Sequence, residues 1–161
     1  MNILVYFLYL VLIAAFEVLG RPLTTFWGVS VNLPVLIVLS VAWTKPELTG
    51  VWFGFWAGLV MAAGTPLVMG WQVLAMAFVA WGAFHARERL NVDSLLARLS
   101  VMFAGVLLHN ALTLLITQSE AFLYQLWRTA LTGAVYTSLL AYLFFRLREG
   151  SPGGRRLGTR V

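Results

Sequence analysis

Six long stretches of this chain contain almost no charged side chain, and this feature constrains the fold more than any other. The stretches cover residues 2–19, 26–43, 48–64, 67–86, 99–116 and 129–145. Each is about as long as an α-helix that crosses the hydrocarbon core of a bilayer. Of the 17 charged residues, 16 lie outside the stretches, and Glu17 is the exception. The sequence therefore predicts an all-α, polytopic membrane protein with six transmembrane helices.

The composition excludes an ordinary soluble domain. Apolar residues make up 61% of the 161 residues and charged residues 11%, whereas soluble domains have roughly 45–50% and about 25%. A net charge of +5 in a chain so poor in charge indicates a membrane protein rather than a nucleic-acid-binding one. The chain has no cysteine, which excludes disulfides, thiolate metal sites and cysteine nucleophiles.

The basic residues predict the orientation in the membrane. If the six stretches alternate across the bilayer, nine of the 11 Lys and Arg residues fall on one side, and only Arg21 and Arg128 fall on the other. The positive-inside rule makes the side with nine cytoplasmic, together with both termini and the 87–98 loop. We therefore expect a six-helix membrane domain over residues 1–147 and a disordered basic cytoplasmic tail over 148–161, close to anionic lipid.

The tryptophans fit this arrangement, because most of them fall near the ends of the stretches, where an aromatic belt lies at each interface. Trp56 is the one placed clearly deeper. The six assigned to the two interfaces are Trp27, Trp71 and Trp127 on the outer side, and Trp43, Trp52 and Trp81 on the cytoplasmic side.

Two stretches carry small residues at a spacing of four, which places them on one helical face. Such a face lets another helix backbone approach closely, either within the bundle or from the transmembrane helix of a partner. The two faces could also pack against each other. Their residues are Gly50, Gly54, Gly58 and Ala62 in the third stretch, and Thr129, Gly133, Thr137 and Ala141 in the sixth.

A polar stripe occupies one face of the fifth stretch, and we expect it to point inward. Interhelical hydrogen bonding is one interpretation, and the lining of a small polar cavity is the other. The stripe consists of Gly105, His109, Thr113 and Thr117 at a spacing of four, with Asn110 beside His109.

Two further features mark helix ends. Glu17 and Arg21 are four residues apart near the outer end of the first stretch, a spacing that suits a structural ion pair on one helical face. A role in binding a substrate or moving a proton is the alternative. Pro34 either kinks the second helix or marks its first turn, and Asn32 suits the N-cap position before it. The tight turn 44–47 then predicts an antiparallel hairpin with the third helix.

The sequence predicts neither a metal or cofactor site nor an enzyme. His109 has no carboxylate beside it within the membrane, and His85, the other histidine, lies near the cytoplasmic end of the fourth stretch. Ser30 lacks the glycine-elbow context of a serine nucleophile, and no motif indicates an oxyanion hole.

The middle of the chain, roughly residues 30–90, resembles the rod shape-determining MreD family. That family combines a Pro-led second helix, a Gly-Phe-x-x-Gly-Leu third helix, a Gly-x-Pro-Leu loop and a basic loop. Ala62 stands where the family often carries an Asp, so no role of that acid is transferred here. The matching segments are Asn32-Leu33-Pro34, Gly54-Phe55-Trp56-Ala57-Gly58-Leu59, Gly64-Thr65-Pro66-Leu67 with Gly70, and Trp81-Gly82 followed by Arg87-Glu88-Arg89-Leu90.

The resemblance implies a non-enzymatic scaffold of the bacterial inner membrane that acts in lateral cell-wall elongation and the maintenance of rod shape. It would bind an MreC-type single-span membrane protein. Through that protein it would be linked to the RodA glycosyltransferase, its penicillin-binding transpeptidase and MreB filaments.

The same family is similar in fold to the substrate-binding subunits of energy-coupling-factor transporters, which gives the alternative of a vitamin-like substrate-binding subunit. Those subunits typically carry an Ala-x-x-x-Ala pattern in the first span. Here Ala14 and Ala15 are adjacent instead.

Overall fold

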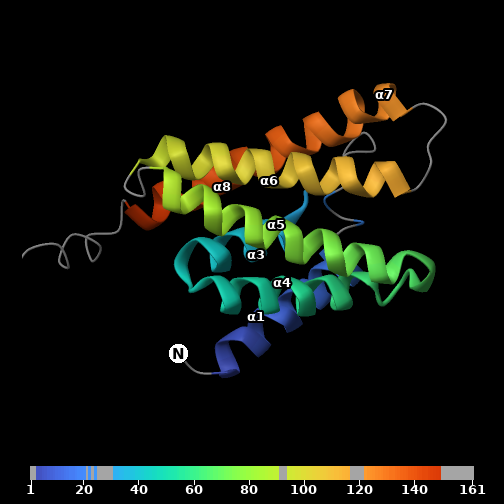
Figure 1. The fold of residues 1–161 in the computed structure, drawn as a ribbon. Helices are drawn as coiled ribbons and strands as arrows, with labels where there is room; N and C mark the ends of the chain where they lie inside the picture. The colour runs from blue at the N-terminus through green and yellow to red at the C-terminus, as the bar shows by residue number, and fades with distance from the viewer. Residues whose placement is uncertain are drawn as a thin grey trace, which may run out of the picture.

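The structure, a computed structural model, describes residues 3–20, 22, 24, 31–90, 94–116 and 122–149, and all regular secondary structure in them is helical. The helices form six successive rods (Figure 1). They are α1 (Ile3–Ala15) with η1 (Phe16–Gly20), α3 (Leu33–Thr44), α4 (Glu47–Ala62), η2 (Pro66–Val68) with α5 (Met69–Arg89), α6 (Leu95–Ile116), and α7 (Phe122–Gln125) with η3 (Leu126–Leu131) and α8 (Thr132–Glu149).

Three of these rods are long and apolar enough to cross a membrane: Ile3–Gly20, Pro66–Arg89 and Leu95–Ile116. Two more, α3 and α4, are apolar but shorter. The last rod contains a π-helical segment, η3, between α7 and α8. The chain is thus an all-helical protein with three candidate membrane spans among its described residues.

The second predicted stretch differs most from the observed helix. It begins at residue 26, whereas α3 begins only at Leu33, and residues 25–30 lie outside the described part of the chain. Pro34 lies in the first turn of α3, where its missing N–H costs no helical hydrogen bond, so it starts the helix rather than kinking it. With 12 residues, α3 is about 18 Å long, well short of a bilayer core.

Short as it is, α3 lies at the centre of the bundle. It contacts α1, α4, α5, α6 and α8, and seven of its residues are buried. The tight turn into α4 contains Lys45 and Pro46, as the sequence predicts, so α3 and α4 form an antiparallel hairpin. In Figure 1 this turn lies at the same end of the bundle as the start of α1, the start of α6 and the end of α8.

The closest packing in the bundle is between α4 and α5. A Cβ atom added to Gly54 would lie 2.8 Å from the carbonyl oxygen of Met76, and one added to Gly58 would lie 2.7 Å from the Cα of Val73. Both neighbouring atoms belong to the backbone of α5. Only glycine allows the two backbones to approach this closely.

The connection between α5 and α6 is shorter than the sequence indicates. The helix α5 continues through Arg89, and α6 begins at Leu95 after Ser94, whose hydroxyl accepts a hydrogen bond from the N–H of Ala97 at 3.4 Å. Ser94 therefore caps α6. At the other end of the chain, α8 extends to Glu149, two residues into the predicted tail, and residues 150–161 lie outside the described part.

The outer surface of the bundle is mostly apolar. Large hydrophobic side chains are exposed along α1, α4, α5 and α8, including Trp52, Trp56, Trp71 and Trp81. Trp43 does not face outward with these tryptophans, because only 6% of its surface is exposed and it packs in the core with residues such as Leu39 of its own helix. The central position of α3 explains this burial.

Replacing Gly58 with alanine tests the α4–α5 contact. We expect Gly58→Ala to lower the free energy of unfolding by about 1–3 kcal/mol, because the new methyl group meets the backbone of Val73. Gly82→Ala is the matched control, since no atom lies within 4 Å of its added Cβ, and alanine should be neutral or stabilise that helix by up to about 1 kcal/mol. Denaturation in mixed detergent micelles measures both variants, and equal stabilities would contradict the predicted packing.

Candidate functional site

Three polar side chains from three different rods meet near the start of α3, and we call Asn32, Asn110 and Thr137 the polar node. The side-chain amide of Asn32 donates to Oδ1 of Asn110 at 2.9 Å. The backbone N–H of Asn32 donates to Oγ1 of Thr137 at 3.1 Å, and the Thr137 hydroxyl donates to the carbonyl of Gly133 at 2.7 Å. The node therefore joins α3, α6 and α8.

Asn32 has an unusual role for a residue at an N-cap position. An N-cap side chain normally accepts a hydrogen bond from the first turn of its own helix, but Asn32 makes no side-chain cap bond. Its amide is directed across the interface to Asn110 instead. The first turn of α3 tolerates this because Pro34 has no N–H to satisfy.

Asn110 extends the node to the π-helical segment. Its Nδ2 donates to the carbonyl of Ala130 in η3 at 3.4 Å. A π-helical turn disturbs the regular i→i+4 hydrogen-bond pattern, and such turns often occur at functional sites. The hydrogen bond to Ala130 thus places the π-helical segment beside the polar node.

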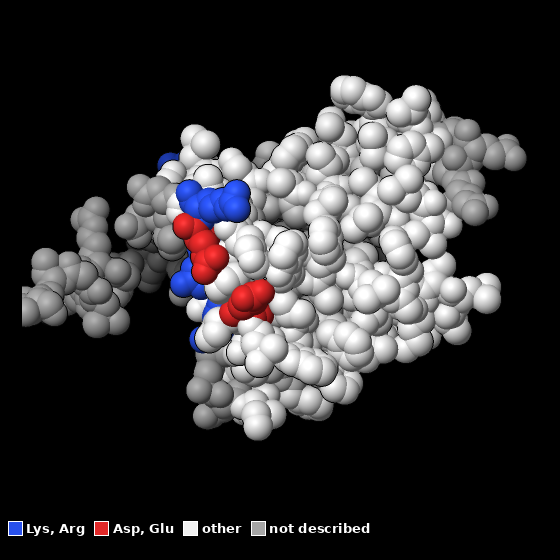
Figure 2. All heavy atoms as spheres, viewed as in Figure 1, with Lys and Arg blue, Asp and Glu red and all other residues white. Residues whose placement is uncertain are grey.

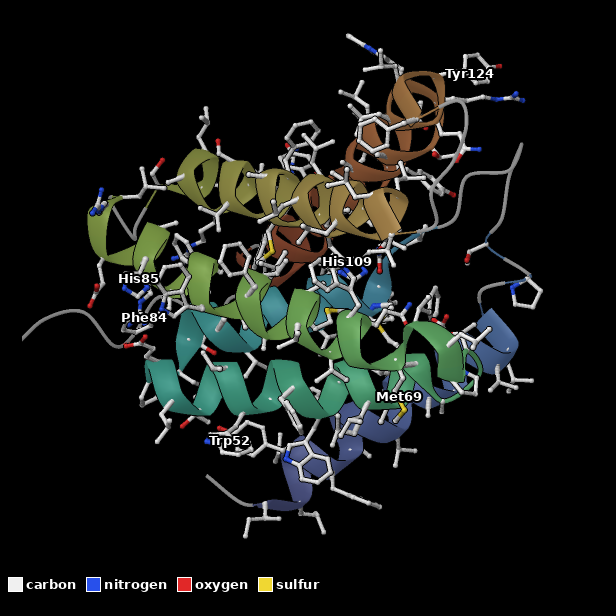
Figure 3. All side chains as sticks on the ribbon, turned by 45° about the vertical axis from the view of Figure 1, so that its right-hand side comes forward. Trp52, Met69, Phe84, His85, His109 and Tyr124 are labelled. Atoms are coloured by element: carbon white, nitrogen blue, oxygen red, sulfur yellow. The ribbon has the colours of Figure 1, made fainter. Side chains whose placement is uncertain are left out.

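The rest of the predicted stripe on α6 also faces the bundle, as far as the structure describes it. Figure 3 shows His109 directed from α6 toward the interior, and only 3% of its surface is exposed. A Cβ on Gly105 would lie 2.7 Å from a methyl group of Leu39, so α3 packs closely there. Thr113 donates to the carbonyl of His109 in its own helix at 2.9 Å. Thr117 lies outside the described residues.

The two small-residue faces do not pack against each other, which corrects that expectation. Gly54 and Gly58 face α5, and Gly50 faces the backbone of Ala42 in α3. Ala62 and Ala141 are fully buried. The face on α8 meets other neighbours, because α8 packs mainly on α6 and also contacts α3. Thr129, Gly133 and Thr137 lie along this last rod, and Thr129 donates to the carbonyl of Gln125.

The structure describes only one of the two residues of the predicted ion pair. Glu17 lies in η1 and is partly exposed, whereas Arg21 lies outside the described residues. In the described part of the chain, no group of three or more His, Asp or Glu side chains is placed to hold a metal ion.

Charged side chains gather at one end of the molecule. Figure 2 shows a narrow band of Lys, Arg, Asp and Glu across that end, while the rest of the visible face is uncharged. The band forms because the α3–α4 turn, the end of α5 and the start of α6 lie at the same end of the bundle. Within it, Nη1 of Arg87 donates to the carbonyl of Lys45 at 3.4 Å, which ties α5 to the hairpin turn. The polar node lies toward the opposite end.

Comparison with known proteins supplies no relative: the chain matches no protein family, no curated protein and no solved structure. Function is therefore inferred from the residues and from the geometry of the bundle.

The amino-acid sequence singles out the three members of the polar node but not their pairing. Asn32 was expected to cap its own helix, Asn110 to belong to a stripe on α6, and Thr137 to a packing face. The available signal was that Asn32 and Asn110 are polar amides within otherwise apolar stretches, where each needs a partner. Which amide pairs with which depends on the fold, since 78 residues separate the two.

A double-mutant cycle tests the node. We expect Asn32→Ala and Asn110→Ala each to reduce stability, and their coupling energy to be roughly 0.6 kcal/mol and at most about 1.7 kcal/mol. Ser100→Ala is the control, because the exposed Ser100 hydroxyl donates to the Leu96 carbonyl of its own helix and not to another rod among the described residues. Its change in stability should stay within about 0.5 kcal/mol. Strictly additive effects of the two Asn substitutions would rule out the bond between them.

Proposed function

We propose that this protein is a non-enzymatic scaffold in the bacterial inner membrane that binds an MreC-type partner and helps to maintain rod shape. The observation that carries the proposal is the position of the segments that resemble the MreD family. They are not scattered over the bundle, but form one closely packed unit of α3, α4 and α5.

Three parts of the family-like pattern have a structural task in that unit. Pro34 starts α3, the central helix. Gly54 and Gly58 bring the backbones of α4 and α5 together. The segment from Gly64 to Pro66 makes the turn between them, where the N–H of Thr65 donates to the carbonyl of Ala62 at 2.9 Å. A pattern in which the proline, the two packed glycines and the turn serve one local fold supports common ancestry better than small residues alone, which are frequent in membrane helices.

This packing also limits where a partner can bind. The glycine face of α4 is filled by α3 and α5, so a partner helix has to meet the exposed apolar sides of the bundle. Trp52 and Trp56 lie on such a side of α4, and Figure 3 shows Trp52 pointing away from the bundle. Association in lipid would rely on van der Waals packing against this surface.

The proposal includes six membrane crossings with both termini in the cytoplasm. Three rods satisfy the length and composition of a span by themselves. The up-and-down course of the rods and the band of charge at one end support the other crossings. In this arrangement, the short helix α3 is shielded from lipid by the helices around it.

Because the chain has no cysteine, single-cysteine variants can test this topology directly. A membrane-impermeant maleimide should label Leu67→Cys, at the fully exposed outer turn, in spheroplasts. It should label Leu90→Cys, at the cytoplasmic end of α5, only after the membrane is opened. Leu139→Cys, exposed in the middle of α8, is the lipid-facing control and should resist labelling in both states. The reverse pattern for the first two sites would overturn the orientation.

Affinity purification from native membranes tests the function. We expect an MreC-type single-span protein to co-purify, together with a glycosyltransferase and transpeptidase of wall synthesis, and depletion of the protein to convert rod-shaped cells into round ones. The polar node beside buried His109 keeps a transporter subunit as the second candidate. Co-purified ATPases, with a stoichiometric small molecule detected by mass spectrometry, would overturn the scaffold proposal in its favour.

A further inference from the structure

Two Tyr–Arg pairs of the same geometry lie on the last rod, one near each end. Nη1 of Arg128 donates to the hydroxyl of Tyr124 at 2.9 Å, and Nη1 of Arg146 donates to the hydroxyl of Tyr142 at 2.8 Å. In both pairs the guanidinium also lies over the tyrosine ring, 5.7 Å and 5.9 Å from its centroid. Each tyrosine thus holds its arginine by the ring and by the hydroxyl.

The distance between the pairs matches the thickness of a bilayer. Eighteen residues separate Tyr124 from Tyr142, and the same number separates Arg128 from Arg146. A helical rod of this length spans at most about 27 Å, close to the roughly 30 Å of the hydrocarbon core. If one pair lies at one membrane interface, the other therefore lies at the opposite interface.

Both guanidinium groups are available to a ligand. Arg128 and Arg146 are exposed, and within the described residues neither forms an ion pair with a carboxylate. A guanidinium has five N–H donors, and the bond to tyrosine uses only one of them. The remaining donors form a planar fork that suits the oxygens of a phosphate group.

The surroundings of the pairs favour a lipid over a free anion. Between them, α8 exposes the apolar side chains Val135, Leu139 and Leu143, which suit contact with acyl chains. Figure 3 shows Tyr124 at the tip of the rod, pointing away from the bundle. A ligand here would have its phosphate at the rod end and its hydrocarbon beside the middle of α8.

We propose that Arg128 and Arg146 each bind the phosphate of a membrane phospholipid, one in each leaflet, with Tyr124 and Tyr142 positioning the guanidinium groups. The inference rests on the proposed membrane placement of the last rod and not on any protein partner. Cysteine labelling that contradicts the topology would therefore refute the placement, whereas a failure of lipid binding with correct labelling would refute only this inference.

Native mass spectrometry of the protein released from nanodiscs containing phosphatidylglycerol tests the proposal. Arg128→Gln and Arg146→Gln should each lower the number of retained lipids by about one, and the double variant by about two. Arg89→Gln is the matched control, because Arg89 is an exposed arginine in the last turn of α5. It should retain as much lipid as the wild type. An equal loss in Arg89→Gln, or no loss in the other two, would overturn the inference.

Two conservative variants distinguish the contribution of the planar guanidinium group to lipid binding from that of its charge. Arg128→Lys keeps the charge but loses the planar fork, and Tyr124→Phe keeps the ring but loses the hydroxyl, so both should retain at least twofold less lipid at the outer site. Wild-type retention in both would overturn the proposed geometry. Displacement of the retained lipid by millimolar inorganic phosphate would indicate a site for free anions and would also overturn the proposal. Circular dichroism checks that each variant keeps its helical content.

Discussion

The close contact between the α4 and α5 backbones at Gly54 and Gly58 is the interaction on which the rest of the bundle depends. In a bilayer, helices gain little by leaving lipid, because the acyl chains are as apolar as the helix surfaces, so association requires dense packing. The glycines make that packing possible. They create a rigid pair of antiparallel helices, and α3 completes it by placing Ala42 against Gly50.

The polar groups of the bundle are placed as an interior without water requires. Hydroxyls such as those of Ser40 and Thr113 donate to carbonyls one turn back in their own helices, an arrangement available to Ser and Thr in any helix. Amides do not fit this pattern, so Asn32 and Asn110 pair with each other across the bundle. The polar node thus links the α3–α4–α5 unit to α6 and α8, which carry no part of the family-like pattern.

In the proposed membrane placement, the last rod would connect the polar node with the two membrane interfaces. Thr137 belongs to the node, and the carbonyl of Ala130 accepts a hydrogen bond from Asn110 of the node. Both residues lie between the two Tyr–Arg pairs. A phospholipid bound in each leaflet would fix the depth of this rod in the membrane. The hydrogen bonds of the node would then hold α3 and α6 at a fixed height relative to the rod. A scaffold that presents apolar sides to a partner helix benefits from such a fixed depth, because both helices must match in register across the bilayer.

The sequence by itself determined the helical class, the approximate helix positions and the separation of charge, because these follow from hydrophobicity and charge read locally along the chain. It also determined which residues are unusual: the spaced glycines, Asn32, Pro34 and the α6 stripe.

The tertiary structure alone decided what these residues contact. Gly58 could pack within the bundle or against a partner, and only the neighbouring backbone of Val73 places it inside. Trp43 lies at the end of an apolar stretch, where tryptophans often face a membrane interface, and it is buried because α3 is central. Asn32 pairs with Asn110 for the same reason: contacts between residues distant in sequence depend on how the rods are arranged, and the local pattern carries no record of that arrangement.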